Sequence, residues 1–373
     1  MLSPATETEL SEIVAAAPGP LRVIGGGTRT MGRPVIGDAL SVAEMRGVVL
    51  YDPGALTIVV RAGTPVAEVE AVLAEAGQRL PFEPMDHRAL LASTGTPTIG
   101  GVVAANVSGP RRLQAGAARD SLIGVRFVDG RGTIVKNGGR VMKNVTGYDL
   151  VKLMAGSWGT LGVLTEVAFK VLPAPALAAC VIIDGLSDAQ AAQAMATALG
   201  SPFEVTGAAH VPGAAPVTML RLEGLAASVD YRAGRLVELM APFGAVRLET
   251  DAAAVAAAWQ AVRDVTRFAD RAGDVWRVSV KPSDGPMIAQ RIDGEVMFDW
   301  GGGLIWALVS EGTDLRARLG DFAGHATLVR AAPDTRLQIA PFQPEPAPIA
   351  ALAAGLRKQF DPRGILNPGL MAE

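Results

Sequence analysis

The stretch Leu21-Arg-Val-Ile-Gly-Gly-Gly-Thr-Arg29 decides how the rest of the chain is interpreted. Four residues with strand character lead directly into three glycines, which are followed by a hydroxyl and a guanidinium. Glycine has no Cβ, so three in succession allow the backbone to turn sharply and to direct its N–H groups into one small space. Thr28 and Arg29 add a hydrogen-bond donor and a fixed positive charge that suit a pyrophosphate. The stretch is either a tight turn between strands or a phosphate-binding loop.

Two common phosphate-binding motifs do not match this stretch. No lysine follows the glycines, which excludes the P-loop. Gly25 and Gly27 fit the start of the Gly-x-Gly-x-x-Gly fingerprint, but Thr30 stands where the third glycine belongs. A phosphate-binding loop here is therefore expected outside a Rossmann fold.

Length and composition exclude several classes of protein. The chain has 373 residues, which as a prior suggests two domains, and its formal net charge is −3. No basic block is present, so we expect no nucleic-acid partner. The single cysteine, Cys180, excludes an intramolecular disulfide, a cysteine-ligated zinc finger and a self-contained iron–sulfur cluster. We expect Cys180 to be a buried, small apolar residue.

The sequence carries no sign of export or of membrane insertion. The first ten residues lack both a basic region and an apolar core, so they do not resemble a signal peptide. The most apolar run, residues 171–183, is interrupted by Pro173 and Pro175. We expect a cytoplasmic protein that contacts the inner face of the membrane only through partners.

The first half alternates short helices and strands. A capping box, Thr6-x-x-Glu9, begins a helix, and Thr64 is expected to cap another whose first residue is Pro65 and which ends at Gly77. The turn signal at 129–132 predicts a hairpin. Further predicted elements are strands at 21–24, 56–61, 122–128, 133–136 and 163–171, and a short helix at 148–155.

A second glycine-rich segment runs from Ser93 to Pro110. Gly95, Gly100, Gly101 and Ala105 keep side chains small, so the backbone can approach a flat ring or a phosphate, and three threonines offer hydroxyl groups. The alternative is a helix of small residues that packs tightly on a sheet. The charged residues that follow, Arg111, Arg112, Arg119 and Asp120, are interpreted as a solvated face.

The second half has a different pattern. Alanine-rich helices at 189–199, 226–240 and 251–269 alternate with strands at 178–183, 217–222, 245–248, 275–280, 304–308 and 326–330. This pattern predicts an antiparallel sheet covered by helices. The fold class is therefore α+β. We expect a domain at 1–173, an α+β cap domain at 174–345, and a helix and tail at 346–373 that return to the first domain.

An ordered set of motifs resembles the vanillyl-alcohol-oxidase/PCMH-type FAD-binding family, and within it the E subunits of bacterial glycolate oxidases. Each motif is weak alone, but the set spans the chain. The first domain carries Gly25–Arg29, Tyr51–Gly54, Leu80–Pro84, Thr98–Gly101, Ser108–Arg112, Val141–Asp149 and Gly156–Val163. The second half adds Trp276–Ser279, Asp299–Gly302, Gly324–Leu328 and Phe360–Gly369.

This resemblance implies an FAD held by a two-subdomain PCMH-type domain. Some relatives link the flavin to a histidine just after the glycine loop, where this chain has Thr28 and Arg29, and the first histidine is His87. We therefore expect non-covalent FAD, and Asn367 in the tail is expected near the flavin. The cofactor-binding residues implied are Gly25, Gly26, Gly27, Thr28, Arg29, Pro84, Gly95, Thr96, Thr98, Gly100, Gly101, Ala105, Gly159, Gly162 and Val163.

The resemblance also implies a function with partners. The first hypothesis is an FAD-binding subunit of a glycolate oxidase complex, which supports oxidation of glycolate to glyoxylate. Electrons would pass from a catalytic flavoprotein subunit to an iron–sulfur subunit. The second hypothesis is a self-sufficient flavin-dependent oxidase or dehydrogenase of a small hydroxy acid, and the third is a non-catalytic scaffold subunit.

The sequence assigns no catalytic residue. Oxidation of a hydroxy acid requires a base for the hydroxyl and a cation for the carboxylate. The chain lacks the clustered histidines that hold a metal in some relatives, so no metal site is predicted. His325 is interpreted as a satisfied structural histidine and His87 as a surface residue. Arg277 either binds a substrate carboxylate or pairs with Asp274 or Asp299.

Overall fold

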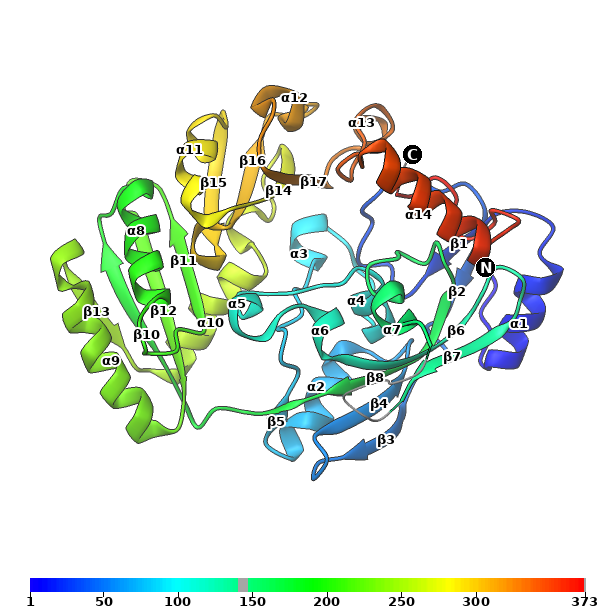
Figure 1. The fold of residues 1–373 in the computed structure, drawn as a ribbon, viewed down its shortest axis with the longest axis horizontal. Coiled ribbons are helices and arrows are strands. Elements are labelled where there is room, and N and C mark those ends of the chain that lie inside the picture. The colour runs from blue at the N-terminus through cyan, green and yellow to red at the C-terminus, as the bar shows by residue number, and fades with distance from the viewer. Residues whose placement is uncertain (140–146, 372–373) are drawn as a thin grey trace. The chain divides into compact units, whose positions relative to one another are not determined.

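The computed structural model describes residues 1–139 and 147–371, which form two compact units (Figure 1). Unit 1 comprises Met1–Ser108, Ala115–Ala174 and Pro344–Glu373, and unit 2 comprises Gly109–Gln114 and Pro175–Gln343. The short segment Gly109–Gln114 therefore belongs to unit 2 although unit 1 surrounds it in sequence. Most of the motif predicted at Val141–Asp149 lies outside the described residues.

Unit 1 is built on a five-stranded sheet of order β3-β4-β8-β6-β7. Strand β8 lies at its centre and is buried on both faces, antiparallel to β4 and β6. The strands of unit 1 are β1 (Leu21–Ile24), β2 (Asp38–Ser41), β3 (Val48–Asp52), β4 (Thr57–Arg61), β5 (Gln78–Arg79), β6 (Leu122–Val128), β7 (Ile134–Gly138), β8 (Val163–Lys170) and β9 (Leu172–Pro173). Its helices are α1 (Glu7–Ala16), α2 (Val66–Glu75), α3 (Arg88–Leu91), α4 (Ile99–Ala104), α6 (Ala118–Ser121), α7 (Leu150–Met154) and α14 (Ala347–Phe360). Helix α5 (Arg112–Ala115) spans the junction with unit 2.

The two strands nearest the N-terminus form a separate parallel pair, β1 with β2. The predicted capping box is present at the start of α1, which buries Leu10 and Val14 in a core shared with Leu21 of β1. The C-terminal tail continues this layer, because Leu21 also bridges to Leu366 in parallel. Residues far apart in sequence therefore meet where β1 enters the glycine loop.

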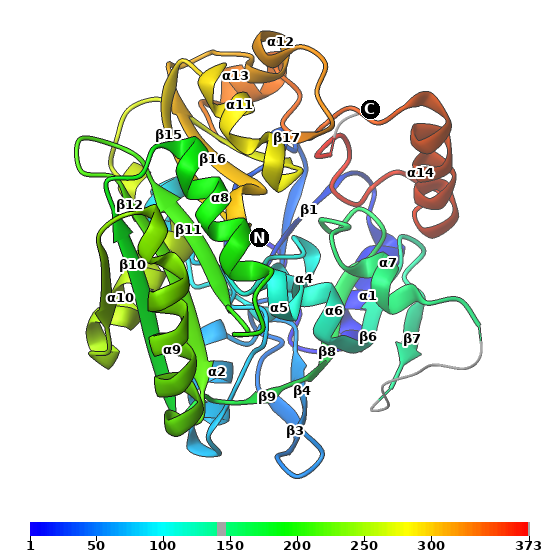
Figure 2. The ribbon, with the colours of Figure 1, turned by 60° about the vertical axis from the view of Figure 1, so that its left-hand side comes forward.

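Unit 2 contains an eight-stranded antiparallel sheet of order β13-β10-β12-β11-β15-β16-β14-β17 (Figure 2). Its strands are β10 (Leu177–Asp184), β11 (Gly207–Val211), β12 (Val217–Gly224), β13 (Val246–Glu249), β14 (Asp274–Val280), β15 (Gly294–Asp299), β16 (Leu304–Val309) and β17 (Gly324–Arg330). Its helices are α8 (Asp188–Leu199), α9 (Ala226–Met240), α10 (Ala252–Arg263), α11 (Gly285–Gln290), α12 (Leu315–Leu319) and α13 (Pro333–Gln338), with 3-10 turns η1 (Ala241–Phe243), η2 (Thr266–Phe268), η3 (Pro282–Asp284) and η4 (Trp300–Gly302).

Helices cover both faces of one half of this sheet. Helices α8 and α9 pack on one face around Val181 and Leu220, and α10 packs on the other face with Trp259 against Cys180. Cys180 is buried, as predicted. The sheet and its helical cover confirm the α+β prediction for the second half.

Three local predictions were wrong. Helix α2 begins at Val66 with Pro65 as its cap residue, whereas the Thr64 hydroxyl instead donates to the Arg61 carbonyl at 2.7 Å. Helix α10 ends at Arg263, because Val265 adopts a left-handed backbone (φ 52°) that a helix cannot continue through. Strands β11 and β15 were not predicted; β11 has little β-branched character and depends on pairing with its neighbours.

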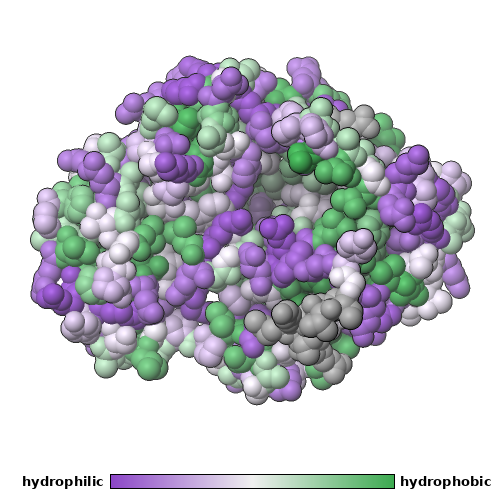
Figure 3. Space-filling view, viewed as in Figure 1, coloured by the Kyte–Doolittle hydropathy of each residue, from purple (hydrophilic) through white to green (hydrophobic). Residues whose placement is uncertain are grey.

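On the face shown in Figure 3, hydrophobic residues lie interspersed among hydrophilic ones. Within residues 1–139 and 147–371, the structure has no helix with the length and apolar character that a membrane crossing requires.

Candidate functional site

The glycine loop after β1 packs backbone to backbone against the segment at Gly95–Thr98. A Cβ on Gly25 would lie 2.5 Å from the Thr98 hydroxyl, and one on Gly26 would lie 1.5 Å from the Thr96 carbonyl oxygen. Conversely, a Cβ on Gly95 would lie 1.8 Å from the Gly26 carbonyl oxygen. The two predicted phosphate-binding segments are therefore brought together, and these three glycines are required by their close approach.

Arg29 places an unpaired cation beside these loops. Its Nη2 donates to the Met85 carbonyl at 3.4 Å, while its buried Nε has no hydrogen-bond partner among the described residues. A Cβ on Gly101 would lie 3.2 Å from its Nη1. Burial lowers the pKa of Arg29 to about 10, although the nearby charge of Asp86 acts in the opposite direction. A desolvated guanidinium without a carboxylate partner fits an anionic group such as a pyrophosphate.

The other residues of the second segment surround the same position. The Thr98 hydroxyl caps α4 by accepting the Gly101 N–H at 3.3 Å, and Ala105 ends the helix. A Cβ on Gly100 would lie 2.7 Å from the Ala62 side chain. The alternative of a small-residue helix packed on the sheet therefore describes α4 correctly, and it explains Gly100 by packing alone.

The third predicted segment, Gly159–Val163, meets the C-terminal tail. A Cβ on Gly159, whose φ is 71°, would lie 2.9 Å from Nδ2 of Asn367. That amide donates to the Trp158 carbonyl, and its Oδ1 accepts the Val23 N–H, both at 2.8 Å. Asn367 thus ties the tail both to β1 and to this loop. Both hydrogen-bonding atoms of the amide are used within the protein, so its role here is a clamp.

The side chains of Gly162 and Val163 have no free surface. A Cβ on Gly162 would lie 2.6 Å from the Phe127 ring, and the Val163 side chain belongs to the core around α1. Any contact of Val163 with a cofactor must come from its backbone. Pro84 is likewise buried, in the loop that carries Met85.

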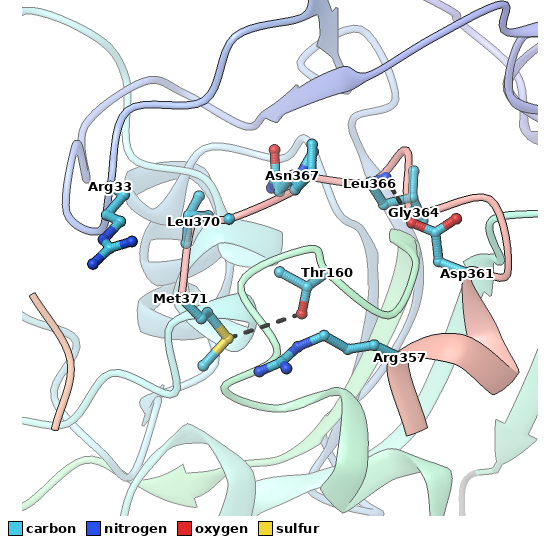
Figure 4. A pocket seen from close by; sticks show the side chains of 11 residues that line it. Arg33, Thr160, Arg357, Asp361, Gly364, Leu366, Asn367, Leu370 and Met371 are labelled. Carbon is cyan, nitrogen blue, oxygen red and sulfur yellow. Dashed lines mark hydrogen bonds between the residues drawn. The ribbon is translucent and has the colours of Figure 1, made fainter. Parts of the chain in front are cut away.

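A cavity of about 470 Å³ lies beside the tail within unit 1. Figure 4 shows Arg33, Thr160 and Arg357 around it, together with Asn367 and Met371 of the tail. The Thr160 hydroxyl donates to the Ser157 carbonyl at 2.7 Å and also contacts the Met371 sulfur at 3.8 Å. The cavity therefore borders the predicted nucleotide-covering loop.

Unit 2 carries a second group of polar residues around Trp300. The Cζ atoms of Arg277 and Arg112 lie 4.8 and 4.9 Å from the centre of the indole ring. Burial lowers the pKa of Arg277 to about 10, the charge of Arg112 lowers it further, and Asp299 raises it. Asp274 does not pair with Arg277, because its carboxylate accepts the Gly312 N–H at 2.8 Å.

Comparison with known proteins identifies the family of the chain. Residues 1–138 match a family described as "FAD binding domain". Glycolate oxidase subunit GlcE of Escherichia coli (strain K12) is 37% identical over 357 residues, which cover 94% of this chain and 92% of that protein. The chain belongs to the GlcE family of PCMH-type FAD-binding proteins. The matched FAD-binding region contains both glycine loops and Arg29.

More distant relatives agree with this placement. Glycolate oxidase subunit GlcD of Bacillus subtilis (strain 168) is 32% identical over 181 residues, covering 47% of this chain and 37% of that protein. Among solved structures, 4-ethylphenol oxidase from Gulosibacter chungangensis superposes with a TM-score of 0.73 at 15% identity, over 99% of this chain and 88% of its own. An alkyldihydroxyacetonephosphate synthase gives a TM-score of 0.70 at 17% identity, over 98% and 76%. These likenesses confirm the predicted PCMH-type fold, and the family is one of FAD-dependent oxidoreductases.

Several predictions about single residues of this GlcE-family chain were wrong. His87 is 6% exposed and its Nδ1 lies 3.2 Å from the Met85 carbonyl oxygen, so it is not a surface residue. His325 is exposed on β17, not a satisfied core histidine. Arg111 is 4% exposed and forms an ion pair with Glu223 at 2.7 Å, so the Arg111–Arg112 pair is not a solvated face.

The sequence held a weak signal for the cluster in unit 2. Asp299–Gly302 was part of the family resemblance, but nothing local showed that Arg112 would join it. That contact depends on the assignment of Gly109–Gln114 to unit 2. Sequence patterns describe neighbours along the chain and could not reveal this long-range placement.

Proposed function

We propose that this chain is the FAD-binding subunit of a glycolate oxidase complex and supports the oxidation of glycolate to glyoxylate. The observation that carries the proposal is the match to the E. coli subunit over nearly the full length of both chains. Within that complex, a catalytic flavoprotein subunit would deliver electrons, and an iron–sulfur subunit would receive them. The single cysteine of this chain is consistent with an iron–sulfur centre on a partner. The complex would work in the cytoplasm and meet the membrane only through its partners.

We further propose that FAD is bound non-covalently in unit 1. When bound, FAD supplies a ring that accepts two electrons. The unpaired Arg29 would neutralise the pyrophosphate, and the glycine loop would offer its N–H groups to the phosphate oxygens. The complete proposed set is Gly25, Gly26, Gly27, Thr28, Arg29, Pro84, Gly95, Thr96, Thr98, Gly100, Gly101, Ala105, Gly159, Gly162 and Val163, with Gly162 and Val163 acting through the backbone.

The charge of the glycine loop can be tested with a matched pair of variants at Gly27. Gly26 is unsuitable, because any side chain there would meet the Thr96 carbonyl at 1.5 Å. Gly27 is exposed, its Cβ would have only Ile24 at 4.0 Å, and its φ of 68° is one that Asn and Asp tolerate. Gly27→Asp and Gly27→Asn therefore share shape and strain but differ by one negative charge.

We expect Gly27→Asp to bind FAD roughly tenfold to hundredfold more weakly than Gly27→Asn. Two like charges about 5 Å apart at an effective dielectric near 20 repel by about 3 kcal/mol. Arg29→Gln should also weaken binding, since a hydrogen bond to a charged group contributes about 1.5–3 kcal/mol. Equal FAD affinity of the Gly27→Asp and Gly27→Asn proteins would refute the assignment of this loop to the pyrophosphate.

The linkage of the flavin is tested by acid precipitation of the holoprotein. Non-covalent FAD stays in the supernatant, and the precipitated chain keeps the mass of its sequence. A yellow pellet with the added mass of FAD would contradict this part of the proposal.

A self-sufficient hydroxy-acid oxidase is the second candidate, and the cationic cluster around Trp300 is the observation in its favour. The two functions differ in what the isolated chain does. If the chain is a subunit that depends on partners, glycolate added without oxygen leaves its flavin oxidised. Bleaching of the flavin absorbance in the isolated chain, at a rate matching turnover, would establish the stand-alone enzyme instead.

A further inference from the structure

Trp300 occupies a strained and firmly held position at the end of β15. Its backbone has φ of 53°, and Gly301 and Gly302 continue in the same region at 66° and 99°. Its N–H donates to Asp299 Oδ1 at 2.7 Å, and its indole Nε1 donates to the Gly109 carbonyl at 3.1 Å. Strained backbone of this kind persists where the surroundings fix it and is concentrated at functional sites. The indole is therefore a rigid platform.

Two guanidinium groups from distant segments contact this one indole. Arg277 lies on β14 and Arg112 at the start of α5, and each is within 5 Å of the ring centre, at 4.8 and 4.9 Å. Their like charges oppose each other at this distance, which the folded chain tolerates only with a compensating gain. Among the described residues, no carboxylate lies within ion-pair distance of Arg277. The nearby Asp299 already uses Oδ1 for the Trp300 N–H.

Other buried arginines of unit 2 differ from Arg277 in this respect. Arg111 pairs with Glu223 at 2.7 Å, and Arg263 pairs with Asp264 at 2.8 Å. A buried guanidinium is normally paired in this way. Arg277 thus stands out as a cation whose partner is not supplied by the described part of the chain.

The strand register adds further polar groups next to Arg277. In the β14–β17 pair, Arg277 stands opposite Thr327 and Ser279 stands opposite His325. Residues that alternate along a strand, and those opposite them on the next, project from the same face of a sheet. The other face of these strands is apolar and packs the core with Trp276, Val278, Ala326 and Leu328. Hydroxyls and an imidazole therefore share one face with the cation.

We propose that this polar face of unit 2, defined by Arg112, Arg277, Ser279, Trp300, His325 and Thr327, is a binding site for a small carboxylate. The guanidinium groups of Arg277 and Arg112 neutralise the carboxylate above the indole, and the hydroxyl and imidazole groups serve an adjacent hydroxyl or keto oxygen. The geometry alone indicates a carboxylate; that it is a 2-hydroxy or 2-oxo acid rests on the proposed function.

Isothermal titration calorimetry of the full chain loaded with FAD tests this site. Glycolate and oxalate are the probes, glycolamide is the uncharged analogue, and phosphate tests a general anion site. We expect saturable binding of glycolate and oxalate to one site, with no binding of glycolamide and weaker binding of phosphate. Loss of preference for a carboxylate over phosphate would overturn the assignment.

Variants locate the binding. Arg277→Gln should weaken glycolate binding at least tenfold, and Arg277→Lys should give an intermediate loss, because lysine keeps the charge but not the planar fork. Arg318→Gln is the control, since Arg318 is an exposed arginine of the same unit, paired with Asp293 at 3.1 Å. Equal binding by the Arg277→Gln, Arg318→Gln and unaltered chains overturns the proposal. Circular dichroism verifies that each variant is folded, and the lysine variant decides if the glutamine variant is not.

The flavin content separates this inference from the proposed function. A chain that binds FAD but not glycolate or oxalate would refute the carboxylate site and leave the FAD-binding proposal intact. A chain that binds glycolate through Arg277 but never takes up FAD would support the site and refute the FAD-binding subunit.

Discussion

Replacing Arg277 by glutamine should stabilise the ligand-free protein. Burial, helped by the charge of Arg112, lowers the pKa of Arg277 to about 10 from an ordinary value of about 12.5. At 1.36 kcal/mol for each pKa unit, keeping the guanidinium charged in the folded state costs about 3 kcal/mol. Arg277 is partly exposed, so solvent screening reduces this cost to about 2 kcal/mol. Loss of the contact with the Trp300 ring removes about 0.5–1 kcal/mol of stabilisation.

The expected net gain is about 1 kcal/mol, or a rise of roughly 2–4 °C in Tm for a unit of this size. Thermal and guanidinium unfolding at pH 7, in a buffer free of carboxylates, would measure it. Saturating glycolate should reverse the order, since only the unaltered chain is stabilised by binding. A loss of more than about 1 kcal/mol in the Arg277→Gln protein without ligand would refute the reasoning, because it would mean that Arg277 is paired and structural.

Three other predictions follow from individual contacts. Burial and the charges of Arg277 and Arg112 lower the pKa of His325, so its proton NMR titration should fall below pH 6.5, and Arg277→Gln should raise that midpoint. Since the folded state disfavours the charged imidazole, His325 should destabilise the fold only as the pH drops through about 6.5; an unchanged midpoint in the variant would contradict the proximity. Arg111→Ala leaves Glu223 buried without its closest partner and should lower the free energy of unfolding by about 3 kcal/mol, and a loss below 1 kcal/mol in urea would show that the pair is solvated. Asn367→Ala removes two hydrogen bonds of about 1 kcal/mol each, so limited proteolysis should cut the C-terminal tail faster, and an unaltered cleavage rate would argue against the clamp.

The sequence by itself determined the elements whose signals are local. The capping box at Thr6 and Glu9, the hairpin turn after Val128 and the left-handed glycine after α2 each depend on residues within one turn or one hairpin. Such interactions are the same in any tertiary context, so pattern and propensity suffice for them. The ordered motifs also sufficed for the family, because the order of segments is a property of the chain.

Only the tertiary structure decided why particular residues stand where they do. Gly26 is required by the Thr96 carbonyl, 70 residues further along the chain, as much as by any phosphate. Arg111 and Arg112 looked like a solvated face, yet Arg111 pairs with Glu223 and Arg112 contacts Trp300.

These contacts share a physical cause. They join segments distant in sequence, and their energy comes from burial and from charges brought together by the fold, which no local pattern encodes. The stretch from Leu21 to Arg29 shows both sides. Its composition predicted a loop suited to phosphate, and its packing against Gly95–Thr98 is what fixes the shape of that loop and leaves the Arg29 cation buried and unpaired among the described residues.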